Sequence, residues 1–206
     1  MDIKVYNLFC EAETKEKKEA LCYWYLSDIK DWLQLYSDNL IKDDEIYDTF
    51  VATWSKCGGD IAGVVSTASI DMQETEVGYN DKTGNTMWDI IKAHRPRLPK
   101  KIKKTGMTIY RACNRAELED NYYGSMGASW STDIDVARRF LQSNFDGVVV
   151  KYTAVDETIC AYTDNRGEKE YICPYIDQSD CEILEEALNK NPNEMVMTYL
   201  LANEIA

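Results

Sequence analysis

Two carboxylates stand two residues apart at the start of a strand-like segment, Gly167-Glu168-Lys169-Glu170-Tyr171-Ile172-Cys173-Pro174. Because successive side chains of a strand point to opposite faces, the spacing predicts that Glu168 and Glu170 share one face, about 7 Å apart at the backbone. Such a pair can stabilise positive charge on a ligand or take up a proton. A solvated strand edge is the alternative that involves no chemistry.

A permanently charged side chain stands near the end of another strand candidate, residues 107–113. The segment Tyr110-Arg111-Ala112 carries a guanidinium, and its planar set of donors binds phosphate oxygens better than an ammonium group does. Arg111 therefore suits a ligand with a pyrophosphate. The alternative is a surface arginine that pairs with an acidic side chain.

Two serines flank a tryptophan in a short strand that we expect at 128–132. Alternation places Ser129 and Ser131 on one face, where either hydroxyl could hydrogen-bond a carboxylate. Trp130 points to the other face, which favours a core position. Asp133 then caps a helix, and the residues on the apolar face of that helix are Val136, Ala137, Phe140 and Leu141.

The order of these three segments resembles that of the mono-ADP-ribosyltransferases of the Arg–Ser–Glu class, over residues 107–176. The matching segments are Tyr110-Arg111-Ala112, Ser129-Trp130-Ser131-Thr132-Asp133 and Glu168-Lys169-Glu170-Tyr171-Ile172-Cys173-Pro174. The resemblance implies that NAD is the substrate, that ADP-ribose passes to a protein side chain, and that nicotinamide is released. It implies no metal. The chain has no His-Gly-Thr segment, which argues against the diphtheria-toxin and poly-ADP-ribose-polymerase class.

The resemblance also implies a role for each residue. Glu170 would bond the ribose and stabilise the positive charge that develops there. Glu168 would orient or deprotonate the acceptor, and a Glu at this place favours arginine as the acceptor. The serine that holds Glu170 is Ser129 or Ser131, and we favour Ser129. The residues that the resemblance assigns to NAD binding are Arg111, Tyr110, Ala112, Trp130 and Phe140, and those assigned to acceptor recognition are Tyr162 and Arg166.

Composition narrows the classes of protein. With 45% apolar residues among 206, the chain can bury a full hydrophobic core. The seven cysteines form no Cys-x-x-Cys pair and there is only one histidine, so a zinc site lacks ligands. We expect reduced, mostly buried thiols in a cytoplasmic protein. We find no apolar run long enough to span a membrane and no signal-peptide pattern.

The net charge of -13 predicts repulsion from nucleic acid and from anionic membranes over most of the surface, and it favours a basic protein partner. One segment departs from this pattern, because residues 95–104 carry six Lys and Arg and two Pro. This segment is either a solvated linker or a contact for phosphate or nucleic acid.

We expect an α+β protein with a mainly helical region at 1–104 packed on an ADP-ribosyltransferase-like split β-sandwich at 105–206, with NAD in a central cleft. The expected N-terminal elements are a strand at 2–9, one long helix from Thr14 to Leu40, a helix at 43–56, and a short helix before Pro96. The segment at 60–70 fits a helix or a strand, and 71–85 fits a loop. The expected C-terminal elements are strands at 147–154 and 158–163, a helix at 180–190 opened by a Ser179–Glu182 capping box, and a last helix from Pro192.

The expected function is therefore transfer of ADP-ribose from NAD to a protein. Substitution of Glu170 is the first test of this expectation. An effector inside a bacterial host cell, such as a phage-encoded modifier or an anti-CRISPR factor, is the setting that the resemblance suggests. Three alternatives stay open at this point. One is an NAD glycohydrolase, in which water replaces the acceptor, and another is a non-catalytic acidic protein that uses the same fold to bind and inhibit a partner. The third is ADP-ribosylation of nucleic acid, which the basic segment at 95–104 favours and the overall negative charge opposes.

Overall fold

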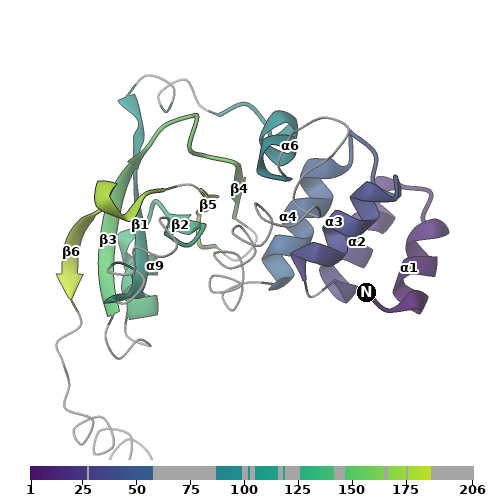
Figure 1. Ribbon diagram of the computed structural model, residues 1–206, viewed down its shortest axis with the longest axis horizontal. Coiled ribbons are helices and arrows are strands. Elements are labelled where there is room, and N and C mark those ends of the chain that lie inside the picture. The colour runs from purple at the N-terminus through teal and green to yellow at the C-terminus, as the bar shows by residue number, and fades with distance from the viewer. Residues whose placement is uncertain are drawn as a thin grey trace, which may run out of the picture.

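The computed structural model describes residues 1–26, 28–57, 87–98, 102, 105–115, 118, 126–141, 147–164, 167–174 and 176–186. Within these ranges the chain is α+β, with six α-helices and one antiparallel sheet of six strands. Figure 1 shows the helices of the N-terminal part gathered on one side of the molecule, while the sheet and helix α9 (Ile134–Leu141) lie on the other side. The expected α+β class is thus confirmed.

Five helices form the N-terminal part of the molecule. They are α1 (Ile3–Cys10), α2 (Lys15–Tyr25), α3 (Ile29–Ser37), α4 (Ile46–Cys57) and α6 (Met87–His94). The side chains of Asp2, Thr14 and Asp28 cap α1, α2 and α3 by accepting a hydrogen bond from a backbone N–H of the first turn. The apolar faces of these helices meet around Trp32 and Phe50, which are both fully buried, with ring centroids 5.6 Å apart.

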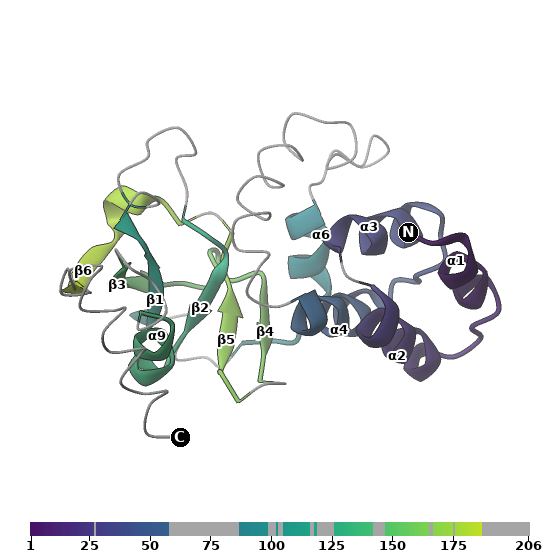
Figure 2. The same ribbon diagram turned by 90° about the horizontal axis from the view of Figure 1, so that it is seen from below.

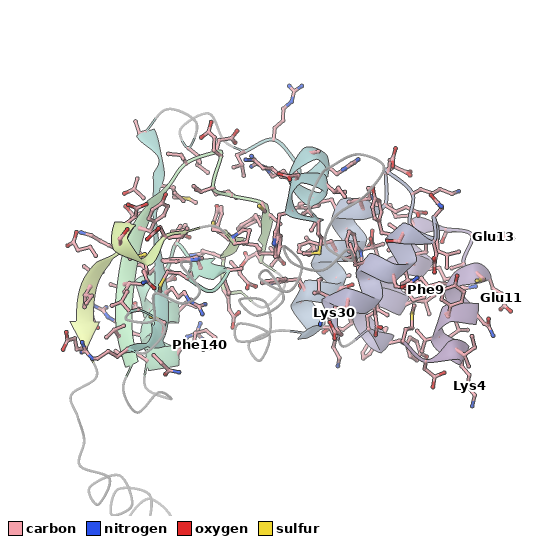
Figure 3. The ribbon with its side chains drawn as sticks, in the orientation of Figure 1. Lys4, Phe9, Glu11, Glu13, Lys30 and Phe140 are labelled. Atoms are coloured by element: carbon pink, nitrogen blue, oxygen red, sulfur yellow. The ribbon has the colours of Figure 1, made fainter. Side chains whose placement is uncertain are left out.

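Two expectations for the N-terminal segment are wrong. Residues 2–9 do not form a strand: residues 3–9 lie in α1, and Asp2 caps this helix, with its Oδ1 accepting from the Lys4 N–H at 2.7 Å. Val5 and Phe9 are four residues apart, so a helix brings both to the face that packs on its neighbours. The single helix expected from Thr14 is two helices, because Asp28 begins a new one. Figure 3 shows Phe9 within the helical part of the molecule.

The sheet has the strand order β4-β5-β2-β1-β3-β6, and every pair is antiparallel. The strands are β1 (Met107–Asn114), β2 (Ser129–Ser131), β3 (Gly147–Ala154), β4 (Ala161–Thr163), β5 (Glu170–Ile172) and β6 (Glu182–Glu186). Long central strands β1 and β3 pair over their full length, from Met107 with Ala154 to Asn114 with Gly147. The expected strands at 107–113, 128–132 and 147–154 are confirmed, and the one expected at 158–163 is shorter.

The prediction of a helix at 180–190 is wrong for residues 180–186, which the structure describes. Residues Gln178–Asp180 form a 3-10 turn capped by Asp177, and the chain then enters β6 as the edge strand beside β3. A cross-strand ion pair between Lys151 and Glu182 (2.9 Å) and a pair between Arg138 of α9 (Ile134–Leu141) and Glu185 stabilise this strand. Residues 187–190, the helix expected from Pro192, and the segments at 60–70 and 71–85 lie outside the described residues.

The helices contact the sheet at its β4 edge through α4, whereas α9 packs against β1, β2 and β3 (Figure 2). The core around the helices continues into the sheet, since one apolar cluster also contains Ala128, Cys160, Ala161 and Ile172. Helix α6 holds the turn between β3 and β4. There Lys92 Nζ donates to the Glu157 carbonyl at 2.5 Å, and Arg95 pairs with Asp156 at 3.0 Å. The first charge of the basic segment at 95–104 is therefore neutralised by the protein itself.

The structure describes the side chains of six of the seven cysteines, and four of these, Cys22, Cys113, Cys160 and Cys173, are buried. Burial raises the pKa of both the Cys22 and the Cys160 thiol to about 12. The thiolate is the form that reacts with alkylating agents, so these thiols are unreactive near neutral pH. We predict that iodoacetamide at about pH 8 modifies exposed Cys10 well before either of them, and that denaturant abolishes the difference. Peptide mapping by mass spectrometry measures this order, and equal labelling of Cys10 and Cys22 in the folded protein would contradict it.

Candidate active site

Glu170 is a buried carboxylate at the first position of β5. Its side chain lies in the interior, and the residue is only 4% exposed. Its Oε1 atom accepts hydrogen bonds from the Ser129 hydroxyl at 2.5 Å and from the Trp54 indole N–H at 2.8 Å. Burial of a carboxylate is unfavourable unless hydrogen bonds offset the loss of water. The fold therefore maintains a carboxylate at this position with donors from two distant parts of the chain.

The two serines of β2 have different contacts. In the β2–β5 register Ser129 lies opposite Ile172 and Ser131 lies opposite Glu170. The Ser129 hydroxyl reaches the Glu170 carboxylate, whereas the Ser131 hydroxyl donates to the Glu168 carbonyl at 2.6 Å and accepts from the Asp133 N–H at 3.0 Å. Ser129 thus contacts the carboxylate itself. Ser131 fixes the turn before β5 and the start of the helix after β2.

Arg111 joins β1 to β2. The residue is 7% exposed, and its Nη1 donates to the Ser129 carbonyl at 3.0 Å. Because Tyr110 pairs with Ser131, alternation places Tyr110 and Ala112 on the serine side of the sheet, and the Cβ of Arg111 starts on the opposite side. The contact with Ser129 makes Arg111 a support for the strand that carries the serine.

The turn before β5 changes the expectation for Glu168. The strand begins only at Glu170, and the preceding Lys169 has a left-handed φ of 45°, as does Gly167 at 68°. The Lys169 N–H donates to Asp164 Oδ1 at 3.1 Å, which holds the turn. Simple alternation therefore does not extend from Glu170 to Glu168, and the shared strand face expected for them is absent. Glu168 is half-buried in the turn that leads directly to Glu170.

Trp54 is the residue of this site that the sequence analysis did not identify. It lies on α4, 116 residues before Glu170, and it is 6% exposed. Phe50 and Trp54 are four residues apart, so the helix expected at 43–56 places both on one apolar face, and both are buried there. The sequence of an apolar helix face does not indicate which acceptor a tryptophan N–H on it will bond, so only the tertiary structure reveals the contact.

Two aromatic residues expected at the NAD site, Trp130 and Phe140, have different surroundings. Trp130 is 1% exposed, and its indole N–H donates to the Gly127 carbonyl at 2.9 Å in the core on the other side of β2. Phe140 is 45% exposed, because α9 buries its first turns at Val136 and Ala137 and leaves its last turn open. Figure 3 shows Phe140 on the sheet side of the molecule, far from the labelled residues of the helical part.

Tyr162, expected to take part in acceptor recognition, lies on β4 at the contact with α4. Its ring is 4.7 Å from that of Tyr171, and its backbone carbonyl and N–H bond the Tyr47 hydroxyl at 2.8 and 3.1 Å. Burial raises the pKa of Tyr47 and of Tyr162, so both hydroxyls stay neutral at physiological pH. Tyr162 is 36% exposed, which leaves part of its side chain open to a partner. Arg166 lies outside the described residues.

Comparisons of the chain with protein-family models, with curated proteins and with solved structures find no match. Within the ranges that the structure describes, no three His, Cys, Asp or Glu side chains are grouped so that they could hold a metal ion. None of the helices described is long and apolar enough to cross a membrane. A functional assignment therefore depends on the geometry around Glu170.

Proposed function

We propose that this protein is a mono-ADP-ribosyltransferase that takes NAD as its substrate and releases nicotinamide. The observation that supports the proposal is the hydrogen-bonded series from Arg111 through Ser129 to Glu170, on three strands that are neighbours in the sheet. These are the three residue types of the Arg–Ser–Glu class, in the same chain order. In the proposal the sheet is part of a split β-sandwich, and NAD binds beside the serine side of β2 and β5.

The chemistry assigned to Glu170 follows from its surroundings. Cleavage of the bond between nicotinamide and ribose leaves positive charge on the sugar. A carboxylate held in a fixed position stabilises that charge without having to reorganise during the reaction. Ser129 and Trp54 provide this fixation through Oε1, and Arg111 in turn fixes the backbone of Ser129. The class also gives its arginine a contact with the pyrophosphate of NAD. The Arg111 side chain starts on the side of the sheet opposite Ser129 and Ser131, so in the proposal Arg111 acts by holding the strand that carries Ser129.

The acceptor that we propose is an arginine side chain of a protein. Glu168 lies in the turn directly before Glu170, where a second carboxylate can orient a guanidinium and accept its proton. The partly exposed Tyr162 lies on β4, the strand next to β5. The net charge of -13 favours approach of a basic acceptor protein.

Nicotinamide release from NAD, measured with and without bacterial lysate, tests the proposal. We expect release by the wild-type protein and transfer of label from adenine-labelled NAD to a lysate protein, with neither above background for Glu170→Ala. Release that depends on Glu170 but leaves every protein unlabelled, with free ADP-ribose as product, would replace the transferase by an NAD glycohydrolase. Absence of release under all conditions would overturn the proposal and favour a non-catalytic binding protein.

A further inference from the structure

We infer that Trp54 is a positioning residue for Glu170, which makes helix α4 a working part of the active site. The inference rests on the proposed function, because it assigns Trp54 a part in the reaction of Glu170. It gives the helical N-terminal region a role in catalysis in addition to its packing on the sheet.

The contact between Trp54 and Glu170 has the properties of a specific hydrogen bond. Its length is 2.8 Å, both residues are at most 6% exposed, and the acceptor is a carboxylate. An indole N–H can donate a hydrogen bond but cannot accept one, so it is matched to the acceptor oxygen of Glu170. Hydrogen bonds to charged groups contribute more to stability than those between neutral groups.

The indole ring itself is held firmly. Its neighbours are the rings of Phe50 and Trp88, with centroids 5.8 and 6.1 Å away. Trp54 also shares a helix face with Tyr47, seven residues earlier, and the Tyr47 hydroxyl bonds both the carbonyl and the N–H of Tyr162. Helix α4 is therefore fastened to β4 at one point and to β5 at another, which fixes the position of the indole N–H relative to Glu170.

Both identified donors to Glu170 converge on a single oxygen atom, Oε1. Ser129 is on the neighbouring strand and Trp54 is on a helix, so the two donors approach from different elements and together restrict rotation of the carboxylate. Loss of one donor would allow the carboxylate to leave the orientation that the reaction needs. This loss affects the chemical step more than the binding of NAD, so kcat should fall with little change in KM.

The variant that tests the inference is Trp54→Phe, which removes the N–H and keeps an aromatic ring. The matched control is Trp88→Phe, because Trp88 belongs to the same aromatic cluster, is 3% exposed, and has a buried indole N–H without a hydrogen-bond partner among the described residues. We expect Trp54→Phe to lower kcat about 10- to 100-fold with KM within about twofold of wild type. Trp88→Phe keeps an aromatic ring beside Trp54 and removes no donor to Glu170, so kcat and KM should stay within about twofold of wild type. Equal losses for the two variants, or full activity of Trp54→Phe, would overturn the inference while leaving the proposed function intact.

A measurement without NAD separates this inference from the proposed function. In a ¹⁵N–¹H spectrum the Trp54 indole resonance is identified as the one missing from Trp54→Phe. We expect Glu170→Gln to shift this resonance and to leave that of Trp88 in place. An unshifted Trp54 resonance would overturn the inference even in an active enzyme. If the wild-type protein failed to release nicotinamide, the proposed function would fall, and a shifted resonance would still support Trp54 as the residue that holds Glu170.

Discussion

Glu170→Gln is expected to lower kcat for nicotinamide release about 10³-fold while the protein remains folded. The amide has nearly the shape of the carboxylate, and its oxygen can still accept hydrogen bonds from Ser129 and Trp54. What the variant lacks is the negative charge that, in the proposed reaction, stabilises positive charge on the ribose. Because burial of a neutral amide costs less than burial of a carboxylate, the free energy of unfolding should change by no more than about 1 kcal/mol.

Steady-state kinetics and thermal unfolding of the same preparation test both halves of this expectation. Glu182→Gln is the matched control, since it removes an exposed carboxylate from β6, at the opposite edge of the sheet from β4. This control should retain wild-type kinetics. Activity of Glu170→Gln near that of wild type would show that Glu170 is not needed for the reaction. An unfolded Glu170→Gln would show that the negative charge is needed for stability of the fold.

The strands that carry the candidate site could be predicted from the sequence because their signals are local. Alternation identifies the segment of β2, and the turn residues Asp164 and Gly167 mark the approach to β5. The detail of that turn could not be predicted. A left-handed Lys169 costs conformational energy, and the chain adopts it where surrounding hydrogen bonds hold the turn.

Local sequence signals also fail to show tertiary packing, and this explains the two wrong predictions at the ends of the described chain. At residues 2–9 an alternating pattern and a capped helix were both compatible with the sequence, and packing of Phe9 against other helices decides for the helix. At Ser179–Glu182 a capping-box pattern is present, yet pairing of β6 with β3 and its ion pairs outweighs the local preference. Trp54 belongs to the same group, because its partner is fixed by tertiary structure alone.

A buried ion pair within the helical region gives the largest expected effect on stability. Lys18 Nζ of α2 lies 2.7 Å from Glu45 Oε2 just before α4, and the two side chains are only 6% and 5% exposed. Glu45 Oε2 also accepts from the Lys42 N–H at 2.8 Å. Lys18→Met would leave the Glu45 carboxylate buried without its cation, so we expect the free energy of unfolding to fall by about 3–5 kcal/mol.

Denaturant unfolding of two further variants shows whether burial is the cause. Lys15→Met removes a lysine of the same helix whose ion pair with Asp48 is exposed, and it should cost about 0–1 kcal/mol. The double variant Lys18→Met/Glu45→Gln leaves no buried charge and should recover a large part of the stability that Lys18→Met loses, because replacing both partners of a buried pair is often close to neutral. Equal losses for Lys18→Met and Lys15→Met would mean that the interior around Glu45 is well solvated. Since Glu45 directly precedes α4, a loosened pair would also weaken the helix that carries Tyr47 and Trp54 to the sheet, and the kcat of Lys18→Met should then fall together with its stability.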